Sequence, residues 1–192
     1  MTSRQPSKLL PELIARLEPG RRLQVLDVGP AMPDTVQFFS EYRCKLHFLD
    51  IFAELPLASG DDAPPPTDQF RDMLVFGTEP RFDICLFWDV FNYLDGNAVT
   101  AFLDTLLPFL HPGTRGHGFA VHNPRTATGG QAYAIADESH FSARPRVSEP
   151  GHYSPHSQAA LKDMLYCFDV DRSMLLGDGR LEYRLKIRKS TR

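Results

Sequence analysis

The sequence lacks several features that would assign a protein to a class at once. No apolar run approaches the ~20 residues that a membrane-spanning helix needs, and MTSRQPSKLL at the start has no apolar core of a signal peptide. There is no GxSxG nucleophile elbow and no GxxxxGK[ST] phosphate-binding loop, so hydrolase and kinase chemistry gain no support. We therefore expect a cytoplasmic protein with no membrane partner.

Cysteine is scarce, and positive charge is not in excess. The three cysteines, Cys44, Cys85 and Cys167, lie far apart in apolar runs, which indicates buried side chains and a reducing compartment. The net charge of −3 gives no electrostatic basis for nucleic-acid binding. The basic run from Arg180 to Arg192 is a local exception, which could meet a polyanion or an acidic partner or be a solvated strand face.

What the sequence does contain is an alternation of strand-like and helix-like segments. Short apolar runs predict buried strands at RLQVLDV (22–28), CKLHFLDIF (44–52), FDICLFWDV (82–90) and TRGHGFAVHN (114–123). Helical spacing predicts helices at PSKLLPELIARL (6–17), PDTVQFFSEY (33–42), NAVTAFLDTLLPFL (97–110) and SQAALKDMLYCF (157–168). A chain of 192 residues with this alternation predicts one α/β domain over 1–192, Rossmann-like and doubly wound, with a mainly parallel sheet.

Some segments depart from this alternation. Residues 54–69 are rich in Pro, Gly and Asp and predict an exposed loop, whereas FRDMLVF (70–76) is ambiguous between helix and strand. Residues 124–155 show little periodicity and predict a long insertion between a strand and a helix. Asp-Gly between strand-like runs at 169–177 and 180–188 predicts an antiparallel hairpin.

Three short motifs carry a resemblance to a known family. They are VLDVG (25–29), FLDIF (48–52) and FDICLFWDVFNYLD (82–95). Together with the order of elements they resemble class I S-adenosylmethionine-dependent methyltransferases over nearly the whole chain. The resemblance implies a seven-stranded sheet that ends in an antiparallel hairpin, S-adenosylmethionine as the cofactor, and the 124–155 insertion as a candidate lid over the acceptor site.

Several residues become candidates for cofactor binding. Ligands of such sheets bind outside the carboxyl ends of the strands, so Gly29, Asp50 and Asp89 are expected to face one crevice. Gly29 lets the backbone approach a ligand, and the Asp50 carboxylate can accept hydrogen bonds from both ribose hydroxyls. The resemblance adds Asp27 at the methionine part of the cofactor, Pro30 and Ala31 in the loop, Ile51 on the adenine, Asp72 at its amino group, and Trp88. The alternatives are a loop cap for Asp27, a hydrated carboxylate for Asp50 and a core position for Trp88.

The glycine loop departs from the family pattern at Ala31 and Pro33, where further glycines are common. A positive φ at Ala31 would cost roughly 1–2 kcal/mol, which corresponds to an affinity loss of about tenfold. No such penalty arises if the loop takes a path that leaves φ negative at Ala31. A nicotinamide site would need glycines at 29, 31 and 34, but the chain has Gly29, Ala31 and Asp34. Asp34 would also repel a pyrophosphate, whereas S-adenosylmethionine carries no phosphate.

Methyl transfer from a sulfonium needs alignment, and a base only where the acceptor carries a proton. The candidate bases are His122, His152 and Tyr153, together with His140 and His156, and a solvated role is the alternative for each histidine. The histidine spacing does not predict a metal site. Two functions stay open: a methyltransferase acting on a small molecule or a protein side chain, and a catalytically inactive methyltransferase-like subunit that binds or regulates a partner. The sequence does not indicate the oligomeric state.

Overall fold

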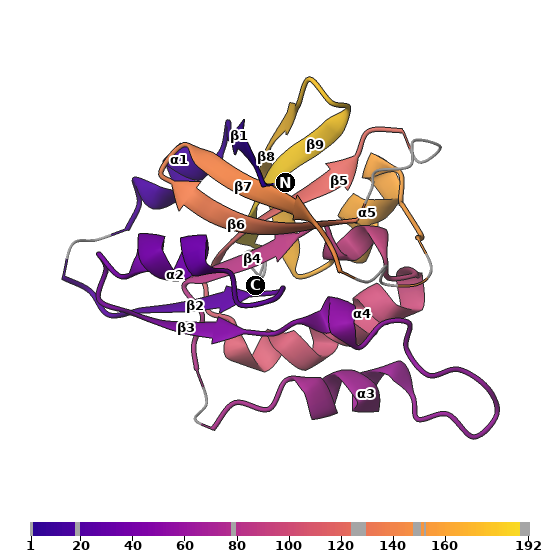
Figure 1. The fold of residues 1–192 in the computed structure, drawn as a ribbon. Coiled ribbons are helices and arrows are strands. Elements are labelled where there is room, and N and C mark those ends of the chain that lie inside the picture. Colours follow the sequence, from indigo (N-terminus) through magenta and orange to yellow (C-terminus); the bar gives the residue numbers. More distant parts are fainter. Residues whose placement is uncertain are drawn as a thin grey trace.

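The computed structural model describes residues 2–17, 20–77, 80–123, 130–147, 151 and 153–188. Its centre is a six-stranded sheet with the strand order β3-β2-β4-β5-β9-β8 (Figure 1). The strands are β2 (Leu23–Asp27), β3 (Cys44–Phe48), β4 (Ile84–Trp88), β5 (Arg115–Val121), β8 (Phe168–Leu175) and β9 (Arg180–Ile187). β2 to β5 run parallel, and β9 is antiparallel to both of its neighbours. The predicted α/β class with a mainly parallel sheet is confirmed.

The large sheet has six strands where the resemblance implies seven. The ambiguous segment FRDMLVF begins inside α3 (Pro66–Met73) and adds no strand in the described residues. Pro66 stands in the first helical turn, where its missing N–H costs nothing, and Phe70 buries its ring completely. β3 is therefore an edge strand, and its exposed Lys45 is a common device for protecting such an edge.

Both faces of the large sheet are covered (Figure 1). One face packs against α3, α4 (Gly96–Leu106) and α5 (Gln158–Met164), and the other against α1 (Leu10–Ile14), α2 (Pro33–Phe39) and a smaller sheet. Along β4 the side chains alternate between the two sides, with Ile84, Leu86 and Trp88 on the α1 side and Cys85 and Phe87 on the α4 side. This fully buried strand is the interior strand that its apolar run predicts.

The smaller sheet has the order β1-β7-β6, with β1 (Ser3–Pro6), β6 (Gln131–Asp137) and β7 (His140–Pro145) all antiparallel. Within the predicted 124–155 insertion, residues 131–145 therefore form regular strands, and they lie between β5 and α5 in the chain. No apolar–polar alternation marks β6, because both of its faces are buried. Tyr133 and Ile135 pack toward the large sheet, whereas Ala132 and Ala134 pack against Met32.

The starts of two helices follow their sequence signals. Asp95 caps α4, since its Oδ1 accepts a hydrogen bond from the Ala98 amide at 2.8 Å. Pro33 is the first residue of α2. Three short 3₁₀ turns complete the core elements, at η1 (Ile51–Ala53), η2 (Val90–Asn92) and η3 (Leu107–Phe109).

The glycines of β5 are required by close packing. A Cβ on Gly118 would lie 2.6 Å from the Tyr183 hydroxyl and 2.7 Å from the Trp88 carbonyl oxygen. A Cβ on Gly116 would lie 2.9 Å from the ring of Phe87. Both glycines therefore let large aromatic side chains cross the strand.

The basic run at the end of the chain is not a free cationic patch in the described residues. Arg180 and Arg184 are buried. Arg180 forms an ion pair with Asp178 at 2.5 Å, and Arg184 forms ion pairs with Asp171 at 2.5 Å and Glu12 at 2.6 Å. Arg188 pairs with Asp169 at 3.0 Å. Lys189 and Arg192 lie outside the described residues.

Glu182 of β9 ties the N-terminal segment to the large sheet. Its buried carboxylate accepts hydrogen bonds from the Ser7 hydroxyl and from the Lys8 amide, and it lies 2.8 Å from His117 Nε2. Burial alone would raise the pKa of Glu182, but these hydrogen bonds and the His117 charge outweigh it and hold the pKa at about 2. In the described part of the chain, no helix is long and apolar enough to cross a bilayer.

Candidate functional site

The carboxyl ends of β2, β3 and β4 meet at one edge of the large sheet. The chain runs from β2 to its neighbour β3 and then returns to β4 on the other side of β2, which makes this edge a topological switch point. Asp27 ends β2, Asp50 follows β3 and Asp89 follows β4 directly. We call the region around these three residues, Gly29, Trp88 and Arg146 the strand-end crevice.

Trp88 fills one side of the crevice. Its indole Nε1 donates a hydrogen bond to Asp27 Oδ1 at 2.6 Å, and its ring stacks on Tyr133 of β6 with 5.6 Å between the ring centroids. Its Cδ1 lies 3.4 Å from the position that a Cβ on Gly29 would take. Trp88 is therefore a buried core side chain, as its alternative interpretation predicts, and the polar end of its indole contacts Asp27.

The backbone at Trp88 is strained. Its φ is +51°, in the left-handed region that costs a residue other than glycine roughly 1–2 kcal/mol, and the register of β4 with β5 shifts at this point. Such outliers concentrate at functional sites. Ala31 has no positive φ, so the penalty expected from its missing glycine does not arise.

Two carboxyl groups of the crevice have raised pKa values. Burial raises the pKa of Asp27 to about 8; the charge of Asp50 adds to the rise, and the Trp88 hydrogen bond opposes it. Burial also raises the pKa of Asp89 to about 6, although the charge of Arg146 opposes this. At pH 7 Asp27 therefore holds a proton, whereas Asp89 is mostly ionised.

Arg146, just after β7, closes the crevice from the side of the smaller sheet. Its Nη2 lies 2.6 Å from Asp89 Oδ1, and its side chain is 7% exposed. The guanidinium carbon lies 3.3 Å from the centroid of the Phe52 ring, a cation–π geometry. Sequence reasoning misses Arg146, because no local signal distinguishes it from Arg144.

Unpaired polar atoms concentrate in this crevice. Six buried side-chain polar atoms of the described residues have no hydrogen-bond partner, and four of them are Asp27 Oδ2, Asp50 Oδ1, Asp89 Oδ2 and Arg146 Nε. Buried polar groups in native proteins are nearly always hydrogen-bonded, so such atoms require an explanation. Asp50 Oδ1 and Asp89 Oδ2 are acceptors, and Asp27 Oδ2 becomes one when its carboxyl group loses the proton, which suits a cationic ligand with several N–H or O–H donors.

A cavity of about 120 Å³ borders Asp50 and Arg146 of the crevice. Its lining residues are Pro30, Asp50, Phe52, Ala53, Ala132, Arg144, Pro145, Arg146 and Val147. Small-molecule sites usually measure about 300–1,000 Å³, so the cavity as it stands holds only part of a nucleoside-sized ligand. Because residues 144–147 form one wall, a shift of this segment would enlarge it.

The other predicted cofactor residues lie in different surroundings. Pro30 lines the cavity, and Ala31 beside it is exposed. Ile51 is fully buried and packs in the core on the α4 side. Asp72 is exposed on α3 and does not line the cavity.

The described candidate bases lie outside the cavity lining. His122 follows β5 and is exposed at the same edge of the sheet as the crevice, and Tyr153 is half-buried with its ring centroid 5.4 Å from that of Tyr93. His140 contacts Asp137 at 3.0 Å, His156 contacts the Leu94 carbonyl at 2.7 Å, and His152 lies outside the described residues. Within the described ranges, no three His, Cys, Asp or Glu side chains gather as a metal ion would need.

No family model and no curated protein sequence matches the chain. Among solved structures, it is similar to a Burkholderia thailandensis 1,6-didemethyltoxoflavin-N1-methyltransferase, with 16% identity and a TM-score of 0.51 over 95% of this chain and 78% of that one. It is also similar to the mitomycin 7-O-methyltransferase MmcR, with 13% identity and a TM-score of 0.51 over 93% of this chain and 53% of that one. At these identities the likeness concerns the fold. The chain therefore has the class I fold of S-adenosylmethionine-dependent methyltransferases, as its strand-end motifs predict.

Proposed function

We propose that the protein is an S-adenosylmethionine-dependent methyltransferase that binds its cofactor in the strand-end crevice. The observation that carries this proposal is the set of unpaired carboxyl oxygens of Asp27, Asp50 and Asp89 at the switch point of a methyltransferase fold. S-adenosylmethionine offers matching donors in its ribose hydroxyls, adenine amino group and methionine ammonium. In this proposal Asp50 accepts from the ribose hydroxyls, and Asp27 faces the methionine part.

Binding requires the crevice to widen, and Arg146 is the contact that must give way. Removing one partner of a buried ion pair costs about 3–5 kcal/mol, because the other charge is left unpaired. The cofactor carries positive charge on its ammonium and sulfonium groups, which can take the place of the guanidinium beside Asp89. Exchange of one cation for another keeps the Asp89 charge compensated.

The acceptor side of the site is proposed at the edge of the crevice near the end of β5. His122 lies there, and Tyr153 and His152 follow the smaller sheet in the chain, so these three are the candidates for removing an acceptor proton. The acceptor is proposed to be a small molecule, because the two similar enzymes are named for methyl transfer to 1,6-didemethyltoxoflavin and to mitomycin. The 130–147 segment would shape its entrance.

Isothermal titration with S-adenosylmethionine and S-adenosylhomocysteine tests the proposal. Saturable heat is expected for the wild type and for Asp61→Ala, which changes an exposed loop carboxylate, and none for Asp50→Ala. Because Asp27 is protonated at pH 7, binding of the cationic cofactor should release protons, which appears as a dependence of the heat on the ionisation enthalpy of the buffer. Arg146→Met should bind more tightly, since the closed contact is removed.

The second candidate is a methyltransferase-like subunit that binds or regulates a partner without catalysis. Three features favour this candidate because they leave little room for a cofactor: the cavity measures only about 120 Å³, the Trp88 indole packs against Gly29, and the Arg146 guanidinium is bound to Asp89. No heat and no thermal shift at millimolar cofactor, for the wild type and for Arg146→Met alike, would reject the methyltransferase in favour of this candidate.

A further inference from the structure

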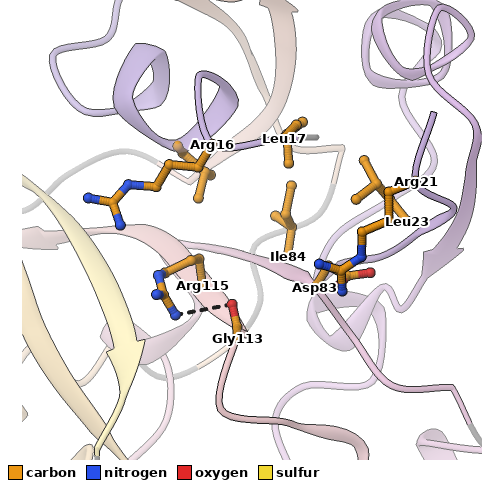
Figure 2. A pocket seen from close by; sticks show the side chains of 9 residues that line it. Arg16, Leu17, Arg21, Leu23, Asp83, Ile84, Gly113 and Arg115 are labelled. Atoms are coloured by element: carbon orange, nitrogen blue, oxygen red, sulfur yellow. Dashed lines mark hydrogen bonds and ion pairs between the residues drawn. The ribbon is translucent and has the colours of Figure 1, made fainter. Parts of the chain in front are cut away.

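A larger cavity lies at the opposite edge of the large sheet, where β2, β4 and β5 begin. Its volume is about 250 Å³. Figure 2 shows its lining side chains, which are Leu13, Arg16, Leu17, Arg21, Leu23, Asp83, Ile84, Gly113 and Arg115. Leu23 and Ile84 open the strands whose other ends carry the strand-end crevice, so the two cavities are separate.

The charges around this cavity are not balanced. Asp83 is the one carboxylate among the described lining residues, and it is already engaged, with Arg21 Nη2 at 2.5 Å and His111 Nε2 at 3.2 Å. Within the part of the chain that the structure describes, Arg16 and Arg115 have no carboxylate partner. Two guanidinium groups thus face the cavity without an ion-pair partner among the described residues, and the charge of Asp171 compensates Arg115 only in part.

Among the described residues, the acids that could neutralise Arg16 are used elsewhere. Glu12, four residues before it, pairs with Arg172 and Arg184 at 2.6 Å each. Asp171 pairs with Arg184 at 2.5 Å. Nearby carboxylates therefore compensate other arginines.

Arg115 is held in position for a ligand. Its Nη1 donates to the carbonyl oxygens of Gly113 at 3.0 Å and Thr114 at 2.9 Å, which leaves Nε and Nη2 with no partner among the described residues. Burial, and then the charge of Arg16, lower the pKa of Arg115, although the charge of Asp171 opposes this. An anion between Arg16 and Arg115 would relieve the repulsion between them.

The middle of the cavity is apolar. In Figure 2, Arg16 and Arg115 lie on one side of the cavity, and Arg21 and Asp83 lie on the other. Ile84 and Leu17 lie between these two pairs. A volume of 250 Å³ corresponds to about eight waters at roughly 30 Å³ each, so a compact molecule of about nine non-hydrogen atoms fits. An inorganic anion would leave the apolar floor uncovered.

We propose that this cavity binds a small aromatic monocarboxylate. The carboxylate lies between Arg16 and Arg115, whose planar guanidinium groups suit bidentate contacts with carboxylates. The ring lies on Leu17, Leu23 and Ile84. This site is independent of the proposed cofactor site.

Isothermal titration of the full chain with sodium benzoate at low salt tests the proposal. We expect one site with a dissociation constant on the order of 1 mM, as for a ligand of about nine non-hydrogen atoms. Acetate, which lacks the ring, and benzyl alcohol, which lacks the charge, should each bind at least about tenfold more weakly. Raising the ionic strength should weaken benzoate binding, because the site is open to solvent.

Arg16→Gln should weaken benzoate binding at least about tenfold, whereas Arg22→Gln, a neighbouring exposed arginine outside the cavity, should not change it. Leu17→Trp, which fills the cavity, is a second variant that should abolish binding. Equal affinities for benzoate in the wild type and both cavity variants would overturn the proposal, as would equal affinities for benzoate and acetate. Asp50→Ala should leave benzoate binding intact, so failure of the cofactor site and failure of this site give different results.

Discussion

Replacing Asp27 by asparagine gives the sharpest test of the strand-end crevice. Burial raises the pKa of the Asp27 carboxyl from 3.8 to about 8 in the folded protein. Between these two values the folded state keeps a proton that the unfolded state has lost, so the free energy of unfolding falls as the pH rises. Each pH unit in this window lowers it by about 1.4 kcal/mol.

The window from pH 5 to pH 7 lies between the two pKa values. Over these two units Asp27 alone should lower the wild-type free energy of unfolding by about 3 kcal/mol. The Asp27→Asn variant keeps an oxygen for the Trp88 N–H but has no proton to lose, so it lacks this slope. Asp89, with a pKa of about 6, also makes the free energy of unfolding fall with rising pH, and it does so in both the wild type and the variant. The free energy of unfolding of the variant relative to the wild type should therefore rise by about 3 kcal/mol from pH 5 to pH 7.

Urea unfolding followed by tryptophan fluorescence measures this difference. Trp88 is the single tryptophan of the chain, and its N–H contacts Asp27 directly, so the probe reports on the crevice itself. The exposed carboxylate of Asp61 supplies the control, and Asp61→Asn should follow the wild-type curve. A difference between Asp27→Asn and wild type that stays constant from pH 5 to pH 7 would refute a buried, protonated Asp27.

Three further changes have expected outcomes in urea unfolding. Gly118→Ala should lower the free energy of unfolding by about 1–3 kcal/mol, because the new Cβ would meet a hydroxyl at 2.6 Å and a carbonyl oxygen at 2.7 Å. Gly177→Ala is the control: its Cβ would enter open space, so its stability should stay within about 0.5 kcal/mol of wild type. The hydrogen bonds from His117 and other donors outweigh burial and hold the pKa of Glu182 at about 2, so the wild type should lose roughly 3 kcal/mol of its free energy of unfolding as the pH falls from 4.5 to 2. Glu182→Gln should not show this loss. Equal acid sensitivity of the two proteins would contradict the assignment. Asp95→Ala should cost about 1 kcal/mol through loss of the α4 cap, and an unchanged midpoint would show that the cap contributes nothing.

Local patterns in the sequence are enough to predict much of the parallel sheet and part of the site. The apolar runs place β2 and β4, and the Asp95 and Pro33 signals place the starts of α4 and α2. The positions of Asp27, Asp50 and Asp89 at neighbouring strand ends also follow, because parallel strands that alternate with helices bring their carboxyl ends to one edge. These features depend on residues that are close together in the chain.

Only the tertiary structure decides how the crevice is filled. Trp88 reaches Asp27 across 61 positions, and Arg146 reaches Asp89 across 57, through a smaller sheet whose strands carry no apolar–polar alternation. The cavity between Arg16 and Arg115 likewise depends on which distant acids the other arginines already bind. Side-chain pairing across such distances is set by packing of whole elements, and burial then moves the pKa of Asp27 far from the value that its residue type alone would predict.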